Sequence, residues 1–357
     1  MTQINVLERM VAQTPTTLWC DSCDPNEIAE SQSWGAIGAT SNPPIILTNT
    51  MTHKEQWAAR AIEIAKSAPE ATELDIAWRL VAEESCMSAR LLEKSFESTS
   101  GADGRMAIQV DPNKHRDTAY MVDQAVDLSK LAPNIIVKIP ATADGIAAIE
   151  DATYRGVTTL ATVSYTVPQA LSAAEAVERG LRRRENEGPE IESIHPKCAI
   201  MVGRLDDWLK AVAARKDLIV DPGCLEWAGV AVFKRAYALY MERGYRTRLL
   251  SAAFRNHMHW SEFIGGRVTI SPQYAWQLKY IASDVTIENR IERPIPPHHL
   301  EALTMHFEDF CRAYEPDGMA PEEFVDFGAT RHTLRQFLGS ITNLGLFVRD
   351  AIMPDLS

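Results

Sequence analysis

The sequence predicts an α/β protein built on a (β/α)8 TIM barrel with a helical C-terminal extension. Eight short apolar runs recur along the chain, and longer amphipathic stretches separate them. Polar or charged residues follow several of these runs, as they do at the carboxyl ends of barrel strands. A doubly wound open sheet is the alternative, and the number of runs favours the barrel.

The predicted strands are short segments rich in apolar and β-branched residues. The clearest, residues 135–139, is mostly apolar and is followed by Pro140, which is typical of a strand buried on both faces of a parallel sheet. In chain order we expect strands at residues 17–20, 36–40, 106–110, 135–139, 159–164, 198–202, 249–254 and 268–270.

The amphipathic stretches between the strands predict the covering helices. One helix is expected to begin at Asp24, because Asp favours the N-cap and the following Pro25 and Glu27 favour the first turn. The other expected helices span residues 57–65, 74–96, 116–131, 145–155, 167–186, 206–214 and 224–243.

The chain is expected to divide into a barrel at residues 1–287 and a helical extension at residues 288–357. Three prolines between residues 294 and 297 form a stiff linker, and amphipathic stretches follow at 321–327 and 330–353. In the last stretch Leu334, Phe337, Ile341 and Leu344 recur at helical spacing, so one helix face should be buried against the barrel. A lid over the barrel or a dimer contact are the alternatives.

Composition limits the classes of partner. The chain has 357 residues, 46% of them hydrophobic, and a net charge of −12, which argues against nucleic acid or an acidic membrane as the main partner. Its N-terminus is polar where a signal peptide needs an apolar core, and no later stretch is apolar enough to span a membrane. We therefore expect a cytoplasmic protein with no membrane partner.

Redox and metal chemistry are not expected. The six cysteines are too sparse for a disulfide framework, and Cys20 in the Cys20-Asp-Ser-Cys23 stretch ends a predicted strand where a redox cysteine would begin a helix. The histidine pairs at 257/259 and 298/299 lack a further ligand at the spacing of a metal site, and no glycine-rich nucleotide loop occurs. The prediction is therefore no metal and no cofactor.

Lys138 is the residue that most directly indicates chemistry, because it interrupts the apolar strand at 135–139. Burying an ammonium group is costly, so the pKa of such a lysine falls until it is a neutral, nucleophilic amine. The alternative is a lysine that extends its ammonium group to water at the strand end.

Other polar residues also stand at predicted strand ends. On one rim of a barrel, a carboxylate, an amide, a hydroxyl and two guanidinium groups around an amine would suit carbonyl chemistry on an anionic substrate. Each has a structural explanation too: Asp21 as a helix cap, Asn42 in a turn, and Arg204 in an ion pair with Asp206 or Asp207. In chain order the set is Asp21, Thr40, Ser41, Asn42, Gln109, Lys138, Thr162, Arg204 and Arg255.

Five segments carry a resemblance to a known family. They are Leu-Trp-Cys-Asp at 18–21, Gly-Ala-Thr-Ser-Asn-Pro-Pro-Ile-Ile at 38–46, Val-Lys-Ile-Pro-Ala-Thr-Ala-Asp-Gly at 137–145, Val-Gly-Arg at 202–204 and Ser-Ala-Ala-Phe-Arg-Asn at 251–256. Together, in this order, they resemble the transaldolase family, which includes fructose-6-phosphate aldolase. The resemblance implies a (β/α)8 barrel that acts on phosphorylated sugars in carbohydrate metabolism, as in the pentose phosphate pathway.

The resemblance also implies residue roles. Lys138 would form a Schiff base with a ketose, and Asp21 would act as acid and base on the substrate hydroxyl during C–C cleavage. Gln109 and Thr162 would hold the water used in iminium formation and loss. The implied substrate-binding residues, with the two arginines on the phosphate, are Thr40, Ser41, Asn42, Arg204, Ser251 and Arg255.

At three positions the residues of this chain can be compared with those of the two branches of that family. Gln109 is the glutamine of the aldolase branch where transaldolases have glutamate, Leu160 replaces a transaldolase asparagine, and Met201 stands where the branches have tyrosine or phenylalanine. We expect transfer of a dihydroxyacetone unit from a ketose phosphate to an aldose phosphate. Release of free dihydroxyacetone is the close alternative, and an inactive barrel with a binding role or an unrelated aldolase or isomerase barrel is a minor one. A homo-oligomer is left open.

Overall fold

The fold is a curled parallel sheet of eight strands covered by helices. The computed structural model describes residues 4–354, so the predicted domain ends at 1–3 and 355–357 lie outside it. The strands are β1 (Thr17–Leu18), β2 (Ala39–Thr40), β3 (Met106–Gln109), β4 (Ile135–Pro140), β5 (Thr159–Thr162), β6 (Lys197–Ile200), β7 (Arg248–Ala252) and β8 (Thr269–Ser271). All eight expected strands are present, with bounds that differ by a few residues.

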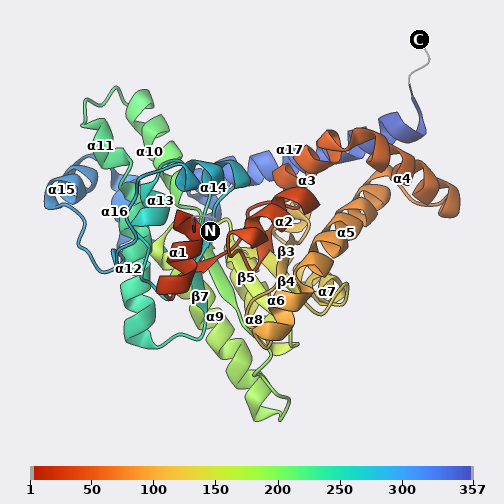
Figure 1. Cartoon of the computed structure of the whole chain (residues 1–357), viewed down its shortest axis with the longest axis horizontal. Helices are drawn as coiled ribbons and strands as arrows, with labels where there is room; N and C mark the ends of the chain where they lie inside the picture. The colour runs from red at the N-terminus through yellow and green to blue at the C-terminus, as the bar shows by residue number, and fades with distance from the viewer. Residues whose placement is uncertain (1–3, 355–357) are drawn as a thin grey trace.

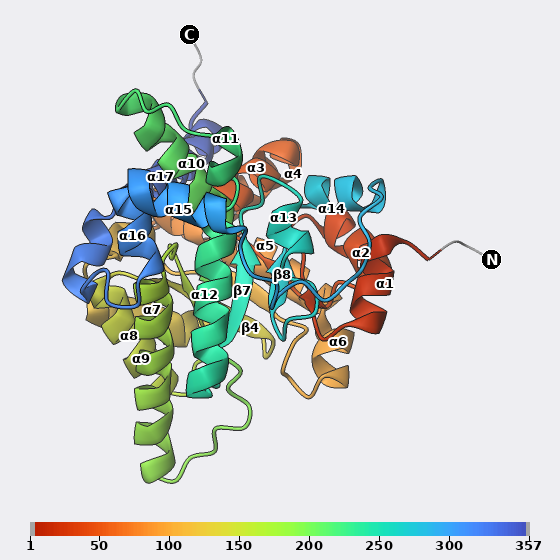
Figure 2. The same ribbon diagram turned by 90° about the vertical axis from the view of Figure 1, so that its left-hand side faces the viewer.

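Every strand pairing in the sheet is parallel, and the order is β1-β8-β7-β6-β5-β4-β3-β2. Figures 1 and 2 show the sheet inside the molecule with helices around it. The two strands at the ends of this order are also joined through the backbone: Cys20 N–H donates to the Gly38 oxygen at 2.9 Å, and Thr40 N–H donates to the Cys20 oxygen at 2.8 Å. This pattern leaves the carboxyl ends of all eight strands at one edge of the sheet.

Side chains on the concave face of the sheet form their own apolar cluster. Its members are Trp19, Ala107, Ile136, Leu160, Ala199, Leu250 and Ala252, from six of the strands or the residues that extend them. Because side chains alternate along a strand, residues two positions further on point to the same side. Gln109, Lys138 and Thr162 therefore form the next layer above the cluster, toward the carboxyl edge.

The helices lie outside the sheet and at its ends. They are α1 (Val6–Gln13), α2 (Pro25–Ser33), α3 (Pro43–Thr52), α4 (Lys54–Ser67), α5 (Glu73–Leu91), α6 (Glu93–Ser98), α7 (Thr118–Ser129), α8 (Ala143–Tyr154), α9 (Val167–Asn186), α10 (Val202–Arg215), α11 (Pro222–Leu225), α12 (Ala228–Arg243), α13 (Met258–Ser261), α14 (Tyr274–Ile281), α15 (Pro297–His306), α16 (Glu308–Tyr314) and α17 (Gly328–Ile352), with 3-10 turns at Pro112–Lys114 and Pro321–Asp326.

Local sequence explains most of these helix bounds. The predicted start at Asp24 is confirmed, because its carboxylate accepts from Asn26 N–H and Glu27 N–H ahead of α2. The expected helix at 74–96 is divided at Leu92, and the one at 224–243 is divided between α11 and α12. The prediction missed α1, α3, α13, α14, α15 and α16, which have weaker or shorter periodic patterns.

The last helix, α17, crosses from the barrel to the N-terminal helices. Figure 1 shows it running along one side of the molecule past α10, with its C-terminal part beside α3 and α4. As predicted, Leu334, Phe337, Ile341 and Leu344 are buried. Within residues 4–354, no helix has the length and apolar character needed to cross a membrane.

Candidate active site

Lys138 lies on β4 and is buried, with 5% of its surface exposed. Its Nζ donates a hydrogen bond of 2.9 Å to the backbone oxygen of Ser41. Burial lowers the pKa of Lys138 to about 8, Asp21 opposes that shift and Arg204 adds to it. Of the two alternatives drawn from sequence, the structure shows the buried amine and not a lysine that extends to water.

Asp21 follows β1 and shares this edge of the sheet. Its Oδ1 accepts a 2.6 Å hydrogen bond from Thr40 Oγ1, which lies 2.9 Å from Ser271 Oγ. Burial raises the pKa of Asp21, while Lys138 and the Thr40 hydroxyl partly offset the rise. Burial thus favours the neutral form of both the amine and the acid, which brings the two groups closer in proton affinity.

Gln109 and Thr162 flank Lys138 on the neighbouring strands. Gln109 is paired in register with Lys138, and Thr162 with Pro140. Gln109 is 4% exposed, and neither its Oε1 nor its Nε2 has a hydrogen-bond partner among the residues described. A buried amide without partners is costly, so this group fits a site that a water or ligand fills.

The side chains of the segment after β2 form mostly structural hydrogen bonds. The hydroxyl of Ser41 donates to the Ala107 oxygen at 2.9 Å, and Asn42 Oδ1 accepts from Ile45 N–H at 3.1 Å as the N-cap of α3. The structural alternative for Asn42, a role in the turn, is therefore observed. The Thr40 hydroxyl is the side chain of this segment that bonds to Asp21.

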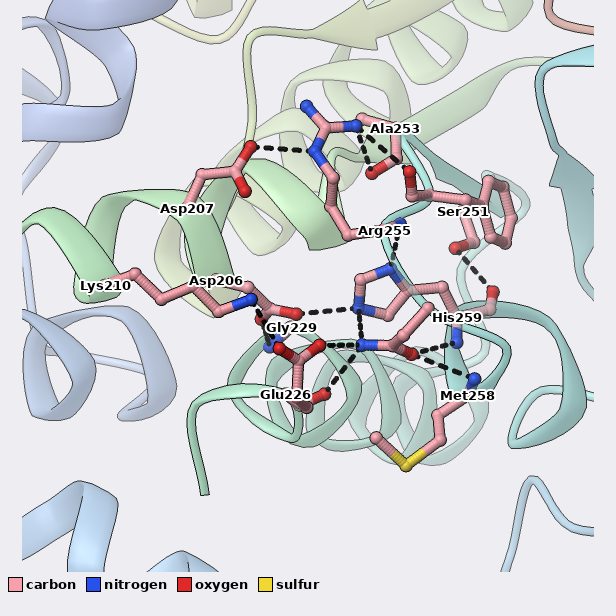
Figure 3. Close-up of polar contacts among 12 residues, drawn as sticks. Asp206, Asp207, Lys210, Glu226, Gly229, Ser251, Ala253, Arg255, Met258 and His259 are labelled. Carbon is pink, nitrogen blue, oxygen red and sulfur yellow. Dashed lines mark hydrogen bonds and ion pairs between the residues drawn. The ribbon is translucent and has the colours of Figure 1, made fainter. Parts of the chain in front are cut away.

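Arg255 follows β7 in a tight turn. Ala253, with a φ of 63°, turns the chain in the left-handed region that is unusual for a non-glycine residue. The Arg255 Nε donates to Asp207 Oδ2 at 2.8 Å, and its Nη1 donates to the Phe254 oxygen at 3.0 Å (Figure 3). Two ordered contacts therefore define the position of this guanidinium group.

A buried histidine and aspartate lie behind Arg255, as Figure 3 shows. Arg255 N–H donates to His259 Nδ1 at 3.0 Å, and His259 Nε2 lies 2.8 Å from Asp206 Oδ2. Since Nδ1 accepts, the ring proton is on Nε2 and is donated to the carboxylate. Asp206 Oδ1 accepts in turn from Gly229 N–H at 2.8 Å.

Arg204, in the first turn of α10, does not pair with either aspartate that the sequence suggested. Asp206 bonds to His259, and Asp207 bonds to Arg255. The Arg204 Nη1 donates instead to α17. Arg204 nevertheless belongs to the site, because its charge contributes to lowering the pKa of Lys138.

Ser251 does not fit its predicted role in substrate binding. Its neighbours Leu250 and Ala252 belong to the cluster on the concave face, so alternation directs Ser251 away from that face of the sheet. Its hydroxyl makes a 3.4 Å contact to the His259 oxygen, on the side of α13. The strand face therefore assigns this serine to packing.

Two residues of the site were missed by sequence reasoning. Ser271 ends β8, one residue beyond the predicted strand, and a polar residue at a strand end was the signal that could have found it. His259 gave no such signal, because its side-chain partners come from two other segments, the turn after β7 and α10. Burial raises the pKa of the Cys20 thiol to about 12.

Comparison with known proteins identifies the family. The model of the Transaldolase/Fructose-6-phosphate aldolase family matches residues 18–327, and the chain belongs to this family. It is 30% identical over 212 residues to a protein named transaldolase from Mycolicibacterium smegmatis, a match covering 58% of this chain and 55% of the relative. A second relative of that name, from Mycobacterium tuberculosis, is 30% identical over 222 residues, or 60% of this chain and 57% of the relative.

The chain thus spans little more than half the length of these relatives. A third protein named transaldolase, from Mycobacterium marinum, is 28% identical over 223 residues and shows the same partial coverage, 57% of its length.

Proposed function

We propose that this protein is a transaldolase-type enzyme that transfers a dihydroxyacetone unit from a ketose phosphate to an aldose phosphate. The observation that carries the proposal is the buried Lys138, whose pKa is lowered to about 8 beside a carboxyl group whose pKa is raised. Family membership supports the same reaction class.

In the proposed reaction the neutral amine of Lys138 attacks the ketone carbon. Loss of water from the carbinolamine forms an iminium ion, the Schiff base. Asp21 takes the proton of the C4 hydroxyl, the C3–C4 bond breaks, and its electrons move into an enamine as an aldehyde leaves. The enamine then attacks the aldehyde of the acceptor, Asp21 returns the proton, and hydrolysis frees the lysine.

Gln109 and Thr162 would hold the water that leaves and returns. The buried amide of Gln109 has no hydrogen-bond partner in the described part of the chain, which supports this assignment, because an amide can both donate to and accept from a water. It cannot take a proton, so in this proposal the proton transfers belong to Asp21 and to the water itself.

Arg204 and Arg255 would bind the phosphate of the sugar through charge-assisted hydrogen bonds. Thr40 and Asn42 would contact substrate hydroxyls, and Ser41 would contribute through the carbonyl that holds Lys138. We also propose that the curled sheet is a closed TIM barrel within residues 1–287, supported by the backbone hydrogen bonds between the ends of β1 and β2, and that residues 288–357 form the helical extension.

A second candidate function is aldolase cleavage that releases free dihydroxyacetone. Gln109 favours it, since glutamine is the residue of the aldolase branch at this position. The two functions differ in the fate of the enamine. Erythrose 4-phosphate is added to the enamine that remains after the donor is cleaved. A new ketose phosphate should form if transfer dominates, and free dihydroxyacetone if release dominates.

Borohydride trapping tests the Schiff base. Incubation with fructose 6-phosphate and borohydride should produce one adduct, located by peptide mapping at Lys138 and absent from Lys138→Met. Lys197 is a matched control, because burial lowers its pKa to about 8 as well, but it begins β6 at the opposite edge and pairs with Asp103 at 3.0 Å. An adduct on Lys197, or none on the wild type, would refute the proposal.

A further inference from the structure

The C-terminal extension reaches the barrel mouth at one arginine. The Nη1 of Arg204 donates to Gln336 Oε1 at 2.7 Å and to Thr333 Oγ1 at 3.3 Å, both on α17. The ring of Phe337, one residue further along this helix, lies 5.8 Å from the Arg204 guanidinium carbon. Three side chains of one helix thus surround the guanidinium group, more than 120 residues away in sequence.

All three of these contacts are electrically neutral. Arg255 has an ion pair with Asp207 at 2.8 Å, whereas Arg204 has no ion pair with a carboxylate anywhere in residues 4–354. The Nε of Arg204 is buried and also lacks a hydrogen-bond partner in this part of the chain. The site therefore contains a cation that is held in position by neutral groups, without a carboxylate in direct contact within residues 4–354.

Neutral and charged hydrogen-bond partners of Arg204 have different consequences for the binding of an anion. A carboxylate beside Arg204 would satisfy the guanidinium and compete with any phosphate that approaches it. An amide oxygen and a hydroxyl restrict the side chain while leaving the full positive charge for the ligand. Burial strengthens the effect, since the field of the charge is less screened there than in bulk water.

We propose that Gln336 and Thr333 are positioning residues that hold Arg204 as an uncompensated cation for the phosphate group of a sugar phosphate. The C-terminal extension is then part of the substrate specificity of the enzyme, because it determines the preference for phosphorylated over unphosphorylated sugars. This inference rests on the proposed function of Arg204 in binding phosphate.

Direct binding of inorganic phosphate tests the inference without requiring turnover. In Gln336→Glu a carboxylate replaces the amide oxygen, and the Kd for phosphate measured by calorimetry should rise about tenfold or more. Gln336→Met removes the hydrogen bond without adding charge, so the Kd should rise only a few-fold, about 3-fold for a loss near that of one hydrogen bond. Thr333→Val should have the smallest effect, because its bond is the longer one.

Asn343→Asp is the matched control. It makes the same amide-to-carboxylate change on α17, seven residues from Gln336 on the same side of the helix. That separation is about 10 Å along the helix axis, close to a Debye length at physiological salt, so the Kd for phosphate should stay near the wild-type value.

A second readout separates this inference from the proposed function. Schiff-base formation with dihydroxyacetone, which has no phosphate, should fall less in Gln336→Glu than kcat/KM for fructose 6-phosphate does, because Arg204 acts on Lys138 only through its charge. Equal phosphate affinity in Gln336→Glu and wild type would overturn the inference, as would an equal loss with both substrates. Failure of wild type to form any adduct would instead contradict the Schiff-base proposal, and the phosphate titration would still decide the role of α17.

Discussion

The backbone oxygen of Ser41 accepts a 2.9 Å hydrogen bond from the Nζ of Lys138. A carbonyl oxygen holds the amine in place without the full charge of a carboxylate, so burial remains the larger influence on the pKa of this lysine. The relationship explains how an amine can be both well ordered and poised to lose its proton.

The rate of Schiff-base formation should therefore depend on pH in a defined way. Below a pKa of about 8 the neutral fraction of Lys138 rises about tenfold per pH unit, and above it the rate should level off. Stopped-flow measurement of imine formation with dihydroxyacetone would give the inflection. An inflection near the ordinary lysine pKa of about 10.4 would contradict this prediction.

Asp21→Asn should move that inflection to lower pH. The carboxylate of Asp21 stabilises the protonated amine, so its removal lowers the pKa of Lys138 below about 8. Turnover should fall strongly, about 100-fold or more, because the acid and base of C–C cleavage is lost. Imine formation does not need that group, so it is the step to measure. An unchanged inflection would show that the two residues do not interact, and an alkaline shift would contradict the direction expected here.

Gln109→Glu should have the opposite effect on the inflection. Gln109 is in register with Lys138 on the adjacent strand, so a carboxylate there would favour the ammonium form and raise its pKa. Imine formation should be slower than in wild type near pH 7 and recover at higher pH. Gln109→Met, which adds no charge, should leave the inflection unchanged.

Asp206→Asn should destabilise the turn that carries Arg255. The carboxylate accepts from both Gly229 N–H and His259 Nε2, and an amide has only one oxygen to offer. One buried donor is then left unpaired, which should reduce the free energy of unfolding by about 1–3 kcal/mol. Urea denaturation measures this loss. Asp207→Asn, at an exposed residue, should cost less than about 1 kcal/mol.

Gly203→Ala should disturb the contact between α10 and β7. A Cβ at this position would lie 2.1 Å from the Ala253 oxygen and 2.5 Å from Arg255 Cγ, so one of the two segments must move. We expect a lower melting temperature and weaker phosphate binding. Gly339→Ala on α17 is the control, because its Cβ meets no described atom within 4 Å and should stabilise the helix by about 1 kcal/mol. Equal melting temperatures of Gly203→Ala and wild type would contradict this prediction.

Much of the architecture could be predicted from local sequence. The eight strands and the cap of α2 depend on apolar runs, β-branched residues and capping side chains that act over a few neighbouring positions. The burial of Lys138 followed in the same way from its apolar neighbours. Motif order was enough to indicate the family.

Only the tertiary structure decided which groups meet. It pairs Asp206 with His259 and directs Ser251 away from the concave face of the sheet. It also leaves Gln109 without a hydrogen-bond partner among residues 4–354 and brings α17 onto Arg204. These arrangements involve segments that are far apart in the chain. A hydrogen bond between such segments depends on how whole helices and strands pack. Local patterns specify which face of an element is buried, whereas the partner on that face is specified by the packing of the complete fold.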